Sequence, residues 1–107
     1  MRGCFSRGIF ATLSLRSDAE LEDVKRAYEE YYAPHAFTFV TDKEIDLKDV
    51  VNTNKCLIHV DKIDGKILIT SAIDNLLKGA VGTAVHNMNL LFGLPERTGL
   101  ALKASAF

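Results

Sequence analysis

Two alternating segments joined by Asp64-Gly65 constrain the fold of this 107-residue chain more than any other feature. Residues 55–63 alternate, with Cys56, Ile58 and Val60 on one side, and residues 66–73 follow as a partner segment. Alternation with a period of two is typical of β-strands, and Asp-Gly is a favoured two-residue hairpin turn. The chain is therefore predicted to build its sheet around this hairpin.

The segment before the hairpin predicts a strand, a helix and a short strand. Residues 8–16 alternate in the same way, and residues 37–40 form a short apolar run. Between them, Ser17-Asp18-Ala19-Glu20 is a candidate capping box, and Pro34 should end the helix that follows. Residues 41–48 are charged and are expected to form a loop. The apolar positions expected along the helix are Leu21, Val24, Tyr28, Tyr31 and Tyr32.

The order of these elements predicts the fold class. Hairpin-linked strands with flanking helices indicate an α+β fold with a mixed or antiparallel sheet and helices on one face. The length suits one domain, residues 1–107. Because the first strand begins almost at Met1, either a preceding segment has been lost or the N-terminus is simply short; the sequence favours neither.

Composition excludes several classes of protein. A net charge of -1 gives no electrostatic footprint for nucleic acid, and 48% hydrophobic residues is an ordinary globular value. No apolar run is long enough to cross a membrane, and residues 1–16 do not resemble a signal peptide. Cys4 and Cys56 are too few for a zinc site and are expected to be reduced. The expected location is cytoplasmic, with no metal, nucleic-acid or membrane partner.

Residues 74–92 are predicted to form a helix with two unlike stripes. One stripe is apolar and is expected to face the core; the other is small and polar. Two glycines inside a helix cost about 1 kcal/mol each relative to alanine, which a chain accepts where something must approach the backbone closely. A neighbouring helix, a second subunit and a ligand all remain open. The apolar stripe is Leu77, Val81, Ala84, Val85, Met88, Leu91 and Phe92; the small stripe is Asn75, Gly79, Gly82, His86, Asn89 and Gly93.

The start of this helix is a candidate anion site. Free amides at a helix N-terminus attract anions, and Lys78 would add a positive charge. If the regular helix begins near Gly79, Lys78 and the Gly79 amide share one site. If it begins at Asn75, Asp74 is an N-cap. The pattern does not choose between the two.

At these residues the sequence resembles a known family. Residues 73–82, Ile-Asp-Asn-Leu-Leu-Lys-Gly-Ala-Val-Gly, and residues 84–100, Ala-Val-His-Asn-Met-Asn-Leu-Leu-Phe-Gly-Leu-Pro-Glu-Arg-Thr-Gly-Leu, resemble the C-terminal signature of N-acetyl-gamma-glutamyl-phosphate reductases. Arg7-Gly8-Ile9 and residues 49–54 resemble two further family segments. Thr83 and His86 stand where the family often has glutamine. Aspartate-semialdehyde dehydrogenases share only the shorter Asp-Asn-Leu-x-Lys-Gly-Ala stretch and rank second.

The resemblance implies a two-domain enzyme. One domain is a Rossmann fold that binds NADP, and the other resembles the C-terminal domain of glyceraldehyde-3-phosphate dehydrogenase. The implied reaction, in arginine biosynthesis, reduces N-acetylglutamyl 5-phosphate to the 5-semialdehyde through a nucleophilic cysteine and an acid–base histidine. Because no G-x-G-x-x-G occurs here, the Rossmann half, the nucleophile and the histidine are expected upstream. Residues 1–107 would then be one partial domain with no catalytic residue, inactive alone.

The resemblance also implies site residues and partners. Arg7 is the expected substrate contact, because arginine pairs with phosphate or carboxylate oxygens through two hydrogen bonds; a salt bridge at a strand edge is the equal alternative. His86 is the only histidine on the small stripe, whereas His35 and His59 are expected at the surface. The expected partners are the Rossmann half, a small-molecule substrate and a second copy of the chain. The expected cofactor-binding residues are Asn75, Lys78, Gly79, Gly82 and Asn89.

Two other functions remain open. The chain could be a free-standing assembly or binding module without catalysis, in which case its small-residue stripe would be an interface. It could also be a small regulatory domain that binds an amino acid. Fold similarity alone does not separate these possibilities.

Overall fold

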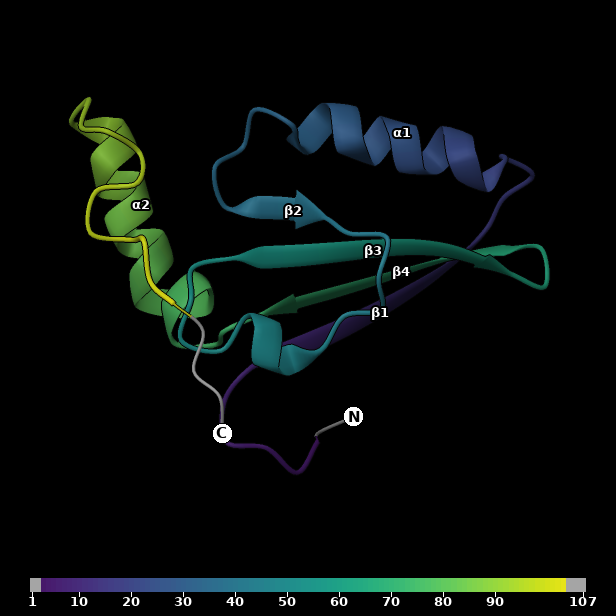
Figure 1. Cartoon of the computed structure of the whole chain (residues 1–107), viewed down its shortest axis with the longest axis horizontal. Coiled ribbons are helices and arrows are strands. Elements are labelled where there is room, and N and C mark those ends of the chain that lie inside the picture. The colour runs from purple at the N-terminus through teal and green to yellow at the C-terminus, as the bar shows by residue number, and fades with distance from the viewer. Residues whose placement is uncertain (1–2, 104–107) are drawn as a thin grey trace.

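The computed structural model describes residues 3–103 of the chain. Its strands form one sheet in the order β1-β4-β3-β2, with α1 across one face and α2 beyond one end (Figure 1). A 3₁₀ turn, Leu47–Asp49, precedes β3, and a π-helical turn, Leu77–Val81, precedes α2. The remaining elements are β1 (Ile9–Arg16), α1 (Leu21–Tyr32), β2 (Thr38–Val40), β3 (Cys56–Ile63), β4 (Lys66–Ile73) and α2 (Gly82–Leu91).

The predicted hairpin is the centre of the sheet. Strands β3 and β4 pair antiparallel, with Val60 opposite Ile69, and turn through Asp64 and Gly65. Both turn residues have positive φ, 52° and 74°, as a two-residue hairpin turn of this type requires. Strand β1 adds antiparallel to β4, whereas β2 adds parallel to β3. The predicted α+β class and mixed sheet are confirmed.

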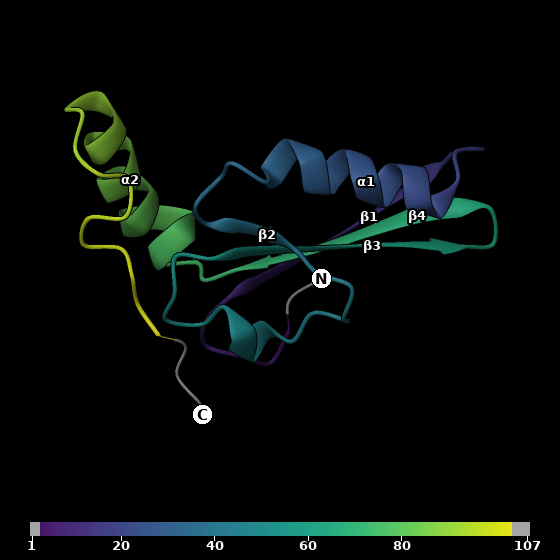
Figure 2. The ribbon, with the colours of Figure 1, turned by 45° about the horizontal axis from the view of Figure 1, so that its top comes forward.

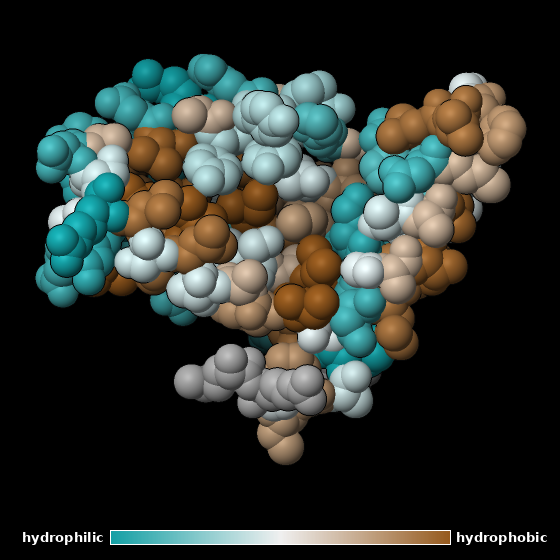
Figure 3. Space-filling view, turned by 180° about the vertical axis from the view of Figure 1, so that it is seen from behind, coloured by the Kyte–Doolittle hydropathy of each residue, from teal (hydrophilic) through white to brown (hydrophobic). Residues whose placement is uncertain are grey.

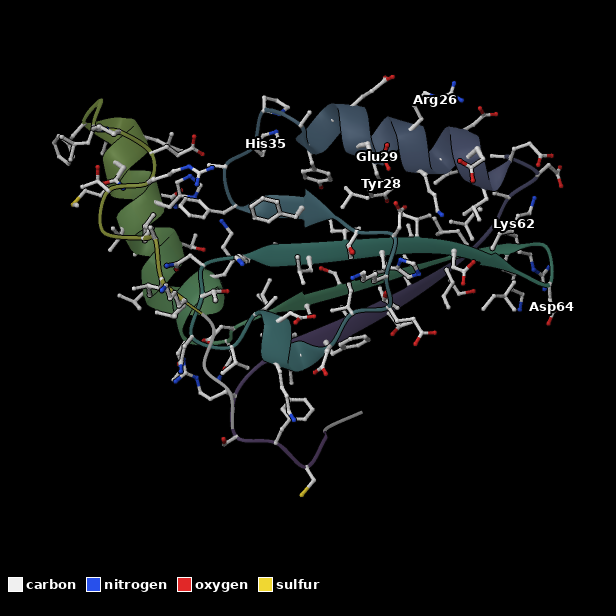
Figure 4. The ribbon with its side chains drawn as sticks, in the orientation of Figure 1. Arg26, Tyr28, Glu29, His35, Lys62 and Asp64 are labelled. Carbon is white, nitrogen blue, oxygen red and sulfur yellow. The ribbon has the colours of Figure 1, made fainter. Side chains whose placement is uncertain are left out.

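The main core lies between α1 and the central strands. Ile58 and Val60 of β3, with Ile67 and Ile69 of β4, are 1–7% exposed and meet the helix residues Leu21, Val24, Tyr28 and Tyr32. Figure 2 shows the helix lying along the sheet. In Figure 4, Tyr28 points from α1 towards the sheet, whereas Arg26 points away from it.

Strand β1 lies outside this core. Every one of its residues is exposed, including Ile9, Phe10, Leu13 and Leu15 at 43–50%. It is an edge strand, because it pairs only with β4. A long apolar edge strand is a template for pairing with another chain.

The predicted start of α1 was wrong, although its end is confirmed. The helix begins at Leu21, and its N-cap, Glu20, makes no side-chain capping bond. The Ser17 hydroxyl accepts from the amide of Ala19 at 3.1 Å, so it closes a local turn before the helix instead of capping it. The helix ends at Tyr32, before Pro34, as expected. Tyr31, expected on the apolar face, is 67% exposed.

The apolar residues and the small residues of α2 differ in burial, but the prediction that the apolar stripe faces the core was wrong. Leu91 and Phe92 are 79% and 70% exposed, and Val81 and Met88 are 56% and 46% exposed. Asn89, from the small stripe, is fully buried. Helical spacing shows which residues share a face, but burial depends on what packs there. Here the chain's own segments hydrogen-bond to the small, polar stripe.

Candidate functional site

The corner between β4 and α2 is organised around the buried carboxylate of Asp74. Its Oδ2 accepts from Arg7 Nη2 and from the amide of Asn52, both at 2.7 Å. Its Oδ1 accepts from the amides of Leu76 and Leu77 at 2.8 and 3.0 Å. Burial raises the pKa of Asp74, but these four hydrogen bonds outweigh it and leave the pKa below its ordinary value. Asp74 therefore accepts from free amides at the start of the helical segment, but the helical turn begins at Leu77 with Leu76 as its N-cap, and not at Asn75 as one of the two interpretations required.

Arg7, the predicted substrate contact, forms an ion pair with Asp74. Its side chain is 30% exposed, and its Nε is buried without a hydrogen-bond partner among the described residues. The next residue, Gly8, donates its amide to Asn75 Oδ1 at 2.8 Å. Arg7 and Gly8 therefore attach the start of β1 to the corner. The structure shows the salt bridge that was the alternative role for Arg7, and substrate contact stays a prediction.

The first turn after Asp74 is π-helical, and this changes the expected anion site. The Gly79 amide donates to the Asp74 carbonyl at 2.9 Å, so it is not free for a phosphate, contrary to the expectation for a helix beginning there. Gly79 and Ala80 are nevertheless exposed, so the corner has an open side. A Cβ added at Gly79 would come no closer than 3.3 Å, to the Asp74 carbonyl oxygen.

Lys78 is held from two directions by residues of α2. The Thr83 hydroxyl donates to the Lys78 carbonyl, and the Lys78 ammonium lies 3.3 Å from His86 Nδ1. The same ammonium lies 5.6 Å from the centre of the Phe37 ring, within the range of a cation–π interaction. Thr83 and His86 are the two positions that depart from the resembled signature, and both contact Lys78.

His86 extends this network to the segment that follows α2. Its Nε2 lies 2.8 Å from Glu96 Oε1, and its side chain is 16% exposed. Its ring meets Phe37 edge-on, with ring centroids 5.2 Å apart. The Arg97 guanidinium lies 5.9 Å from the centre of the same Phe37 ring. The result is a small group of charged side chains between the start of β2 and α2.

Gly82 and Asn89 lie inside the chain. A Cβ at Gly82 would lie 1.8 Å from Asn54 Oδ1, so only glycine fits there without a shift. Asn54 is 3% exposed and donates to the Leu100 carbonyl at 3.0 Å. Asn89 donates to the carbonyls of Glu96 and Thr98 at 3.1 and 3.0 Å. Of the possibilities left open for these small residues, close packing within the protein accounts for Gly82 and Asn89.

Sequence reasoning missed the segment from Val50 to Asn54 as the support of the corner. Val50, Val51 and Thr53 are at most 2% exposed, and Asn52 has a φ of 63°. A signal exists in the sequence: residues 49–54 resemble a segment of the family, and two apolar residues followed by Asn-Thr-Asn indicate a buried turn. The spacing of residues in the sequence does not show that the Asn52 amide donates to Asp74.

The other candidate residues lie at the surface or in the core. His35 is exposed and stacks on Tyr31, and His59 Nδ1 lies 2.9 Å from the Thr41 carbonyl oxygen. Cys4 and Cys56 are both free thiols. Over residues 3–103, no group of histidine, cysteine or acidic residues could hold a metal ion, and no helix is long and apolar enough to span a membrane.

A family model described as the semialdehyde dehydrogenase dimerisation domain matches residues 1–75. The chain belongs to the semialdehyde dehydrogenase dimerisation-domain family. The match covers β1 to β4 and ends at Asn75, so it includes the sheet, α1 and the Asp74 carboxylate. The family model does not cover α2 or the segment after it, whereas the relatives described next do.

Relatives of this dimerisation domain named N-acetyl-gamma-glutamyl-phosphate reductase match the chain from end to end. The protein from Parabacteroides distasonis is 67% identical over 100% of this chain and 33% of its own length. The Bacteroides fragilis protein is 63% identical over 99% of the chain, and the Flavobacterium johnsoniae protein 55% over 99%, each over 33% of its length. The chain therefore spans about a third of these relatives.

Proposed function

We propose that this chain is the C-terminal, dimerising portion of an NADP-dependent N-acetyl-gamma-glutamyl-phosphate reductase. Such an enzyme reduces N-acetylglutamyl 5-phosphate to N-acetylglutamate 5-semialdehyde. The observation that carries the proposal is 67% identity over the whole chain to a protein of that name. Residues 1–107 would be one partial domain of a cytoplasmic enzyme, and the nucleotide-binding domain, the nucleophilic cysteine and the acid–base histidine would lie in the other two thirds.

The corner residues fit one edge of a bound dinucleotide. Gly79 and Ala80 are exposed and carry no bulky side chain, so a flat ring could approach the backbone. The neighbouring Lys78 offers a positive charge, and Asn75 keeps its amide donor, because its Oδ1 already accepts from Gly8. NADPH, when bound, supplies the hydride. Gly82 and Asn89, also predicted as cofactor contacts, are not part of this proposed edge, because they pack inside the chain.

The exposed apolar face of α2 fits a partner domain. Leu90, Leu91 and Phe92 are 58–79% exposed at the end of α2, and Val81 and Met88 continue that apolar surface. Exposed apolar patches of this kind mark interaction surfaces. We assign this face to the nucleotide-binding half of the same enzyme, because it adjoins the corner proposed to meet the nucleotide.

The β1 edge of the sheet, which α1 leaves uncovered, is proposed to pair with a second copy. Viewed from behind, apolar atoms gather over the sheet beneath the polar surface of α1 (Figure 3). Strand β1 contributes Ile9, Phe10, Leu13 and Leu15 to the exposed apolar surface. The family description names dimerisation, which supports a homo-oligomer built through this region. A free-standing assembly module would use the same surface, so oligomerisation alone does not separate that alternative from the reductase.

A hybrid enzyme tests the reductase proposal. The last third of the Parabacteroides distasonis reductase is replaced by this chain, and NADPH oxidation with N-acetylglutamyl 5-phosphate is measured. We expect the hybrid to turn over substrate and the chain alone to show no turnover, because it holds neither nucleophile nor dinucleotide fold. A folded hybrid that binds NADPH yet forms no semialdehyde would overturn the proposal. The unaltered reductase is the matched control.

A further inference from the structure

We infer that His86 is a positioning residue that holds Lys78 at the corner only while the imidazole is neutral. Its Nδ1 lies 3.3 Å from the Lys78 ammonium and its Nε2 lies 2.8 Å from Glu96 Oε1. The inference deepens the proposed function, because Lys78 belongs to the proposed nucleotide edge. The contacts themselves do not depend on any ligand.

The protonation state follows from what each neighbour can do. An ammonium group only donates hydrogen bonds, so Nδ1 must be the acceptor and cannot carry a proton. A carboxylate only accepts, so Nε2 must carry the proton and donate to Glu96. The arrangement therefore needs neutral His86 in its Nε2–H tautomer. It forms a chain of hydrogen bonds from Lys78 through His86 to Glu96.

A second proton on His86 breaks one end of this chain. It occupies Nδ1, removes the acceptor for Lys78 and places two positive charges side by side, while the contact with Glu96 strengthens. The charged groups that contact His86 are Lys78 from the π-helical turn and Glu96 from the segment after α2, and Arg97 lies over the Phe37 ring that His86 also contacts. Imidazole is the side chain that ordinarily changes charge between about pH 5 and 8. Protonation of His86 would thus release Lys78.

Two other contacts limit how far Lys78 can move when His86 no longer accepts from it. The Thr83 hydroxyl fixes the Lys78 carbonyl, and Phe37 lies beneath the ammonium at 5.6 Å. The backbone of Lys78 is therefore held whether or not His86 is charged. Only the direction of the ammonium depends on His86, and that direction decides whether a positive charge lies ready for an anionic ligand.

Nuclear magnetic resonance of this chain tests the positioning directly. We expect His86 to be the Nε2–H tautomer at pH 8, and the Lys78 ammonium protons to exchange more slowly than those of exposed Lys43. As His86 takes up its second proton, the two lysines should become alike. An Nδ1–H tautomer, or a Lys78 ammonium that exchanges as fast as that of Lys43 at pH 8, would overturn the inference.

Two substitutions separate positioning from a general structural role. In His86→Gln the side-chain oxygen can accept from Lys78 and the amide can donate to Glu96, without titrating. The slower exchange of Lys78 relative to Lys43 should therefore persist at low pH. His86→Leu keeps apolar contact with Phe37 but removes both hydrogen bonds, so Lys78 should exchange as fast as Lys43 at every pH. If His86→Gln behaves like His86→Leu, the hydrogen-bond chain is not what holds Lys78.

The hybrid reductase tests whether the positioning of Lys78 by His86 affects nucleotide binding. At pH 8 we expect His86→Leu to weaken NADPH binding roughly three- to tenfold, through lost preorganisation of Lys78, and His86→Gln to restore it. If Lys78→Met weakens binding but His86→Leu does not, the inference is overturned and the proposed nucleotide edge stands. If neither variant changes binding, Lys78 does not meet the nucleotide; that removes the proposed cofactor contact, and the exchange measurement decides the role of His86.

Discussion

Arg7 donates to Asp74 at 2.7 Å across 67 positions of sequence, and this pair ties the segment just before β1 to the residue after β4. The two strands are already neighbours in the sheet, so the pair fixes where their ends meet. Asp74 also accepts from Asn52, which brings a third segment to the same carboxylate. The geometry of the proposed site thus depends on one buried acid.

Asp74→Asn should lower the free energy of unfolding by about 2–4 kcal/mol. The side chain of Asp74 is 0% exposed, and an amide would turn a donor towards groups that themselves donate. Urea unfolding followed by circular dichroism measures the change. Asp42→Asn is the matched control: Asp42 pairs with Lys25 at 3.9 Å but is 82% exposed, so its loss should cost less than about 0.5 kcal/mol. Equal effects would contradict the central role of Asp74.

Acid should destabilise the chain through the same carboxylate. The pKa of Asp74 is lowered on folding, so the folded state holds the charged form more tightly than the unfolded state. Its contribution is therefore complete above the unfolded pKa, near pH 4, and is lost as pH falls through the lower folded pKa. Thermal unfolding between pH 6 and pH 2 should show this loss in the native chain. In Asp74→Asn the midpoint of thermal unfolding should fall less steeply with decreasing pH. An unchanged pH dependence would contradict the role given to the Asp74 carboxylate.

Replacement by alanine should destabilise the chain far more at Gly82 than at Gly79. Gly82→Ala places a Cβ 1.8 Å from Asn54 Oδ1 and 2.7 Å from the Leu77 carbonyl oxygen, so we expect a loss of about 1–3 kcal/mol. At Gly79 the new Cβ would meet nothing closer than 3.3 Å, so stability should change by less than about 1 kcal/mol. Thermal unfolding of both variants tests the contrast. In the hybrid reductase, Gly79→Ala should still weaken NADPH binding.

Leu91→Glu should leave the isolated chain intact but weaken docking of the nucleotide-binding half. Leu91 is 79% exposed, so a charge there should change the free energy of unfolding by no more than about 0.5 kcal/mol. Leu100→Ala is the control for burial, because Leu100 is 3% exposed and its truncation should cost about 2–5 kcal/mol. The midpoint of thermal inactivation of the hybrid reports docking. A midpoint unchanged by Leu91→Glu would remove α2 from the proposed interface.

Leu13→Lys should disrupt self-association through β1. Leu13 is 50% exposed on the edge strand, and lysine on an edge opposes pairing with another chain. Sedimentation at several concentrations should show a shift towards monomer. Lys43→Glu is the comparison, since it changes charge at an exposed loop residue that is not part of β1. If both variants stay equally associated, the second copy binds elsewhere.

The sequence by itself determined the sheet and its centre. Alternation over residues 55–73 with Asp64-Gly65 between the runs specified the β3–β4 hairpin, because strand period and turn chemistry act over a few residues. The same local signals placed β1 and the end of α1 at Tyr32. The motif from Asp74 to Leu100 also identified the family whose named relatives match the chain.

Tertiary structure alone decided which face of α2 is inside and what the corner residues do. Leu91 and Asn89 follow the same helical spacing, but Asn89 is buried because the segment from Glu96 to Thr98 folds back and accepts from it. Arg7 pairs with Asp74, and His86 joins Lys78 to Glu96, because the fold brings together residues whose separation in sequence carries no local signal. Such contacts depend on three-dimensional packing, which periodicity does not encode.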